Sequence, residues 1–175
     1  TPTCASDGAL MADDGPSLCA RCAASGRTCC QDTQVFLSRG DVRRVAAEAP
    51  GEEFSEHAAP ADENYRPDFT YDSVWGRIFG PDGRRRVLRH RGSGDCWFLT
   101  ATGCRLSLDA RPLVCRLYPF DYNATAINGV HGHICPEPER HSAPLLLALL
   151  AMNRSEAEGW RRLLYEEILE EFPLP

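Results

Sequence analysis

CARCAASGRTCC, residues 19–30, places four cysteines within twelve positions, and CWFLTATGCRLSLDARPLVCRLYPF, residues 96–120, adds three more. The first stretch opens on a C-x2-C pair and closes on two adjacent cysteines. One further cysteine, Cys135, follows the second stretch, and Cys4 stands alone near the start. Thiols gathered in two compact groups predict that distant parts of the chain fold around one shared site.

The composition limits the classes of protein to which this chain can belong. A length of 175 residues corresponds to about one domain, and a hydrophobic fraction of 43% suffices for a core. The net charge of -6 argues against nucleic acid as a partner. No apolar run reaches the roughly 18 residues of a membrane span, and no basic-then-apolar leader opens the chain. We therefore expect a cytoplasmic protein, without a membrane partner, in which clustered cysteines hold metal or perform redox work.

The chain is expected to form one domain over residues 18–175, preceded by a flexible lead-in over residues 1–17 that is small, polar and acidic. Ser38 and Asp41 have the spacing of a helix cap for a short helix that Pro50 ends. The acidic, proline-punctuated residues 51–68 are predicted to form a long loop.

Two hairpins and a helical turn are predicted next. Residues 74–80 and 83–90 are expected to pair as strands around a Gly-Pro-Asp-Gly turn. A second hairpin over residues 96–108 should turn near Thr102 and Gly103, and Pro112 suits the start of a helical turn. The fold class is therefore α+β: a small single domain of short hairpins and a few helices, stapled by a cysteine-rich metal site.

The C-terminal segment is predicted to be helical from about residue 143, opened by Ser142 and Pro144. Ser155 and Glu158 have the spacing of a capping box for a second helix. One face of that helix carries the large apolar side chains Trp160, Leu163, Leu164, Ile168 and Phe172.

Metal binding is the favoured interpretation of the cysteines. The predicted ligands are Cys19, Cys22, Cys29, Cys30, Cys96, Cys104, Cys115 and Cys135. A C-x2-C pair can turn both sulfurs toward one ion, whereas adjacent cysteines point in different directions. The spacing therefore leaves open which of Cys29 and Cys30 coordinates, and whether there are one or two sites. Three rivals are a redox couple, a cysteine nucleophile and structural disulfides, the last if the protein is exported.

These two stretches resemble the CxxCxxxCC family of zinc- or iron-chelating proteins. The second signature of that family is a cysteine hairpin followed by Arg-Pro, Cys-Arg and Tyr-Pro-Phe, which occur here within residues 111–120. The resemblance covers residues 19–135 and departs in one spacing, since six residues rather than three separate Cys22 from Cys29. The family includes the cysteine-rich region of bacterial flagellin lysine methylases, which carries an iron–sulfur cluster. The resemblance implies a metal site more firmly than it implies a reaction.

Thiolate ligands suit either zinc or an iron–sulfur cluster. The Cys135-Pro136 pair is like the ending of ferredoxin cysteine runs, and ligands from distant segments suit a cluster, so a 4Fe–4S cluster is favoured and zinc is the alternative. His131 and His133 could add nitrogen ligands to a zinc site. Arg111 and Arg116, which flank Cys115, are expected to offset thiolate charge.

The sequence contains no self-contained catalytic constellation and no glycine-rich nucleotide turn, so an enzyme is the less favoured class. The favoured function is a metal-binding module with a structural, electron-transfer or metal-handling role. The alternatives are a zinc-binding interaction module and an accessory to a cluster-dependent, methylase-like enzyme. A protein partner is left open, and the arginines of residues 84–91 form either a solvated strand face or an anion-binding surface.

Overall fold

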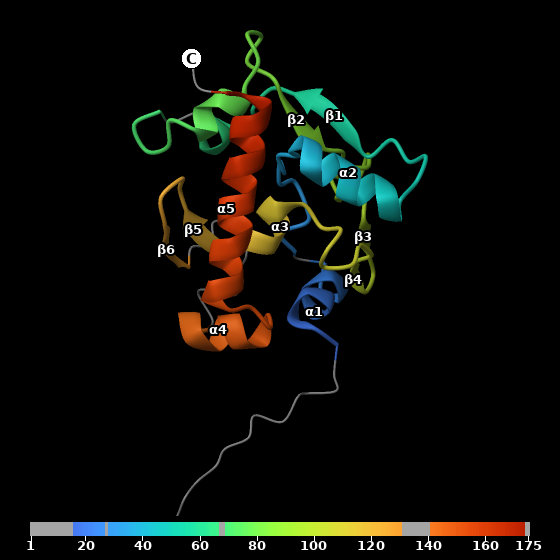
Figure 1. Ribbon diagram of the computed structural model, residues 1–175. Helices are drawn as coiled ribbons and strands as arrows, with labels where there is room; N and C mark the ends of the chain where they lie inside the picture. Colours follow the sequence, from blue (N-terminus) through green and yellow to red (C-terminus); the bar gives the residue numbers. More distant parts are fainter. Residues whose placement is uncertain (1–15, 27, 67–68, 131–140, 174–175) are drawn as a thin grey trace, which may run out of the picture.

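The computed structural model describes residues 16–26, 28–66, 69–130 and 141–173. The expected α+β class is confirmed, because short antiparallel pairs of strands alternate with helices and a long helix closes the chain (Figure 1). The lead-in predicted for residues 1–17 lies almost wholly outside the described residues.

Five α-helices occur in the described part of the chain. They are α1 (Leu18–Ala24), α2 (Arg39–Glu48), α3 (Leu113–Leu117), α4 (Ala143–Leu149) and α5 (Arg154–Glu171). Two short 3-10 helices, η1 (Glu63–Tyr65) and η2 (Trp75–Ile78), lie between the first two strands. None of these helices is long and apolar enough to cross a bilayer.

Three antiparallel pairs of strands accompany the helices. They are β1 (Ser55–Ala58) with β2 (Arg85–Leu88), β3 (Leu99–Thr100) with β4 (Gly103–Cys104), and β5 (Phe120–Tyr122) with β6 (Ile127–Val130). Helix α5 runs through the middle of the molecule, with α3 behind it and α4 across its lower end (Figure 1). Helix α1 lies beside the β3–β4 hairpin, away from α2 (Figure 1).

The predicted start of α2, the turn of the cysteine hairpin and the helical turn after Pro112 are confirmed. Ser38 and Asp41 form the predicted capping box at the start of α2. The hairpin at residues 99–104 turns at the predicted place, and Pro112 directly precedes α3. The predicted capping box of α5 was wrong, because Asn153 caps that helix by accepting a hydrogen bond from the Glu156 N–H.

The first predicted hairpin was also wrong. Residues 75–78 form η2, because the Asp72 carboxylate accepts hydrogen bonds from the N–H groups of Val74 and Trp75 and so begins a helical turn. The partner of β2 is instead β1, which lies within the segment predicted to be a loop. The sequence of β1, Ser-Glu-His-Ala, has no apolar alternation, and Glu56 and His57 are exposed. Its pairing with β2 therefore defines it as a strand.

The core consists of two apolar clusters. One surrounds α2, β2 and the cysteine hairpin and includes Phe54, Leu88 and Phe98. The other lies between α3, α5 and the β5–β6 pair and includes Leu117 and Ile168. Since Leu113 and Leu117 of α3 are completely buried in this second cluster, one face of the helical turn that carries Cys115 is anchored in the core.

Replacement of Ile168 by alanine should lower the free energy of unfolding by about 2–5 kcal/mol, because this side chain is fully buried against α3. The matched control on the same helix is Leu163→Ala. The sequence placed Leu163 on the buried face, but its side chain is 37% exposed, so its loss should cost only about 0.5 kcal/mol. Chemical denaturation of both variants measures the difference, and equal losses would contradict this assignment of the buried face.

Candidate metal centre

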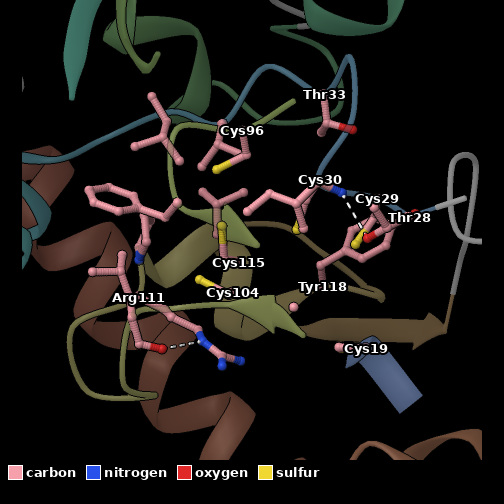
Figure 2. A pocket seen from close by; sticks show the side chains of 18 of the residues that line it. Cys19, Thr28, Cys29, Cys30, Thr33, Cys96, Cys104, Arg111, Cys115 and Tyr118 are labelled. Atoms are coloured by element: carbon pink, nitrogen blue, oxygen red, sulfur yellow. Dashed lines mark hydrogen bonds between the residues drawn. The ribbon is translucent and has the colours of Figure 1, made fainter. Parts of the chain in front are cut away.

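One cavity brings the two cysteine groups together. It has a volume of about 130 Å³, and seven cysteines line it (Figure 2). They are Cys19, Cys22, Cys29, Cys30, Cys96, Cys104 and Cys115. The remaining wall is mostly apolar and includes Val35, Phe98, Leu106 and Leu150.

Helix α1 presents the C-x2-C pair to this cavity. The Ser17 hydroxyl caps the helix by accepting a hydrogen bond from the Ala20 N–H, at 3.2 Å. Positions three apart share a helix face, so Cys19 and Cys22 reach the cavity together. A Cβ on Gly103 of β4 would stand 3.5 Å from the Ala20 nitrogen, so the helix backbone packs closely on the cysteine hairpin. Gly103 also has a φ of +100°, which favours glycine at the contact.

The second half of the N-terminal group is fixed by main-chain hydrogen bonds. The carbonyl of Cys30 accepts a hydrogen bond from the Cys96 N–H at 2.7 Å, and this bond joins the two cysteine stretches directly. Gln31 and Asp95 continue the junction as a β-bridge, and the Gln31 side-chain amide donates to the Asp95 carboxylate at 2.9 Å. Cys30 is therefore positioned by the same hairpin that supplies the C-terminal thiols.

Backbone amides of the hairpin act on the acidity of its cysteines. The N–H groups of Phe98 and Leu99 act to lower the pKa of Cys96, and the N–H of Leu106 acts to lower that of Cys104, although burial outweighs them. Amides two or three residues after a cysteine favour its thiolate form and tune a bound metal. The hairpin therefore offers its sulfurs some support as thiolates, which a bound cation would complete.

Burial is the largest influence on the pKa values of Cys96, Cys104 and Cys115. It raises the pKa of Cys96 to about 12 and also raises the pKa of Cys104 and Cys115, because the apolar wall disfavours thiolates. Cys30 differs, since hydrogen bonds from the Cys29 thiol and the Thr28 hydroxyl lower its pKa, as does the guanidinium of Arg111. The same contact raises the pKa of Cys29.

Four of the thiols all interact electrostatically with one another, and we term them the deep set. Each of Cys30, Cys96, Cys104 and Cys115 lies within electrostatic reach of the other three. Figure 2 shows these side chains around a common space, with Cys29 to one side. Arg111 approaches the deep set, where its positive charge acts to lower the pKa of Cys104, and it is anchored by a hydrogen bond from Nε to the Leu106 carbonyl at 3.0 Å.

The structure thus gathers seven of the eight predicted ligands, including both Cys29 and Cys30. Cys135, His131 and His133 lie outside the described residues. Within the described ranges, no three Cys, His, Asp or Glu side chains already stand as a finished metal site. Binding would therefore require the side chains around the cavity to draw together.

Some residues of the site were missed or misassigned at the sequence level. Arg116, expected to offset thiolate charge, instead donates from Nε to the Arg111 carbonyl at 2.8 Å and also donates to the Asp109 carbonyl. It shapes the turn before α3. His90 and Leu150 also line the cavity. His90 stands six residues before Cys96 and pairs with it in a β-bridge, so a search for imidazoles near the cysteines could have found it. Leu150 carries no polar signal and could not be found from the sequence.

The arginine-rich stretch, expected to be either a solvated strand face or an anion-binding surface, is divided: Arg91 is exposed and Arg89 is partly exposed, whereas other arginines are buried or paired. Arg85 is buried, with its guanidinium over the rings of Tyr65 and Phe79, and Arg86 pairs with Glu171 at 2.7 Å. Arg84 is exposed, whereas its two neighbours serve packing.

Comparisons with known proteins add no relative. No protein-family model, no curated protein and no solved structure matches the chain. The resemblance to the CxxCxxxCC family therefore stands on the two quoted motifs.

In the metal-free protein, Cys30 should be alkylated by iodoacetamide at a lower pH than Cys96. The thiolate is the reacting species, and the pKa of Cys30 is lowered whereas that of Cys96 is raised to about 12. Mass spectrometry of the modified peptides over a pH series measures both profiles.

Thr28→Val removes one hydrogen bond to Cys30 and should shift the Cys30 profile, and only that profile, to higher pH. In denaturant the two profiles should coincide, because the difference arises from folding. If Cys30 and Cys96 of the folded protein are alkylated over the same pH range, the environments assigned to these two thiols would be wrong.

Proposed function

We propose that this cavity holds an iron–sulfur cluster through cysteine thiolates and that the protein is a metal-binding module. The observation that carries the proposal is the convergence of seven thiols, drawn from α1, a loop, the cysteine hairpin and α3, on one cavity. A single buried thiol packs in a core as a small apolar group, but seven thiols from separate segments on one cavity are best explained by a ligand that they share.

The size of the cavity favours a cluster over a single ion. A volume of about 130 Å³ is close to that of an engineered cavity of about 150 Å³ that binds benzene, so it can hold a group of several atoms. A tetrahedral zinc ion needs only four sulfurs at about 2.3 Å and would fill little of this space. Zinc bound by the same thiols is the alternative.

The donor chemistry fits a 4Fe–4S cluster held by the deep set. Cys96 and Cys104 receive backbone amides, and Arg111 supplies positive charge beside Cys104. Such amides and charges, together with an apolar wall, are the means by which a protein sets the potential of a cluster. When bound, the cluster would supply one-electron transfer or a structural cross-link between the halves of the core.

A cytoplasmic location belongs to this proposal, because a reducing compartment keeps thiols available for metal. An accessory role in a methylase-like reaction rests on the family resemblance alone. A resemblance is weaker evidence for function than the geometry of a site. The binding module is therefore the function that the geometry supports best.

Protein purified without oxygen should contain iron and acid-labile sulfide and should absorb broadly in the visible region. Cys115→Ser should abolish the iron, because Cys115 contributes to the deep set from the buried helix α3. Cys4→Ser is the matched control, since the sequence assigns Cys4 to neither group, and it should retain full iron content.

Metal and sulfide analysis, with circular dichroism to confirm folding, separates the outcomes. If the protein is colourless and contains zinc, and if Cys115→Ser loses that zinc, the zinc alternative would replace the iron–sulfur proposal. Folded protein without bound metal, or with paired cysteines, would refute the proposal.

A further inference from the structure

Arg111 brings a positive charge to the wall of the cavity. It is the only arginine that lines the cavity within the part of the chain that the structure describes. Figure 2 shows its side chain along the wall, near Cys104. Its charge acts to lower the pKa of Cys30 as well as that of Cys104. One guanidinium therefore acts on thiols from both cysteine stretches.

The charge of Arg111 is not shared with an acidic partner in the described ranges. Other partly buried arginines pair with carboxylates, as Arg86 does with Glu171 at 2.7 Å. Among the described residues, Arg111 forms no such ion pair. It influences the carboxylate of Glu48, but that group is exposed and accepts hydrogen bonds from Ser107. The guanidinium is therefore left to act on the thiols.

Hydrogen bonds to the main chain hold Arg111 in this position. Its Nε donates to the Leu106 carbonyl at 3.0 Å, and its own N–H donates to the Ser107 carbonyl at 3.1 Å. Its carbonyl accepts a hydrogen bond from Nε of Arg116 at 2.8 Å. Because both the backbone and the guanidinium are anchored, the charge stays beside the cavity. A charge fixed against an apolar wall acts more strongly than one that moves in solvent.

We propose that Arg111 is the charge-compensating residue of the centre and raises the reduction potential of the cluster that the deep set would hold. The inference rests on the proposed function and assigns to one side chain the control of that potential. Reduction transfers one electron from an external one-electron donor to the centre, and no bond forms or breaks. The guanidinium favours the reduced state, because the centre then carries one more negative charge and the apolar wall screens the attraction weakly.

Full-length protein purified without oxygen is titrated with dithionite in the presence of redox mediators, and visible absorption reports the reduced fraction. In Arg111→Gln the midpoint potential should be lower, because the compensating charge is lost. At the potential where half of the unaltered protein is reduced, the ratio of reduced to oxidised cluster should fall roughly tenfold, a shift of about 59 mV for one electron.

Two further variants separate charge from structure. Arg111→Lys keeps the positive charge and should keep a potential close to that of the unaltered protein. Arg84→Gln removes an exposed arginine with the same change in net charge, and it should leave the potential unchanged. Iron and sulfide content, measured on each variant, shows whether the cluster is retained.

The outcomes distinguish this inference from the proposed function. If Arg111→Gln holds a cluster with an unchanged potential, or if Arg111→Lys shifts as far as Arg111→Gln, the inference is wrong and the proposed centre stands. If Arg111→Gln loses its iron, retention of iron by Arg111→Lys supports compensation by charge, whereas loss from both variants makes Arg111 a structural residue and overturns the inference. Unaltered protein without a cluster would refute the proposed function and this inference with it.

Discussion

The buried carboxylate of Asp41 is the interaction on which the placement of the site depends. It accepts a hydrogen bond from the first N–H of α3, that of Leu113, at 2.9 Å, and another from the Ser38 N–H at 3.1 Å. Arg44 pairs with this carboxylate and with Glu167 of α5. The Asp41–Arg44 pair of α2 therefore joins that helix to α3 and α5. Since α3 carries Cys115, this junction also positions a thiol at the cavity.

Burial of Asp41 has an electrostatic cost that its partners offset only in part. Desolvation raises the pKa of Asp41, although Arg44 and the Leu113 N–H act in the opposite direction. A hydrogen-bonded charge in a core fixes a unique arrangement more than it adds stability. Here it helps to fix the direction of a short helix, because it holds the first N–H of α3 while Leu113 and Leu117 pack in the core.

The cavity presents the same electrostatic conflict. Burial raises the pKa of Cys96, Cys104 and Cys115, whereas backbone amides favour the thiolates of Cys96 and Cys104, and Arg111 favours that of Cys104. A cation bound among these sulfurs would resolve the conflict between burial and ionisation, because it favours the thiolates and shares their negative charge. Binding and folding would then be coupled, with the hairpin, α1 and α3 stabilised by the same group.

The sequence by itself determined several local elements that a capping residue, a glycine or a proline delimits. The capping box of α2, the hairpin turn at Gly103 and the helical turn after Pro112 all followed from short-range rules. The grouping of thiols in two stretches also predicted that they would serve one site. The chemistry of a cap or a turn lies within a few residues, so it can be read without the fold.

Only the tertiary structure decided which elements meet. The pairing of β1 with β2, the exposure of Leu163 and the packing roles of Arg85 and Arg86 depend on contacts between residues distant in sequence. The convergence of the two cysteine stretches likewise depends on the main-chain bond between Cys30 and Cys96 and on the close packing of α1 on Gly103. Spacing along the chain gives no distance between segments, because the direction of each connection is set by packing in the core.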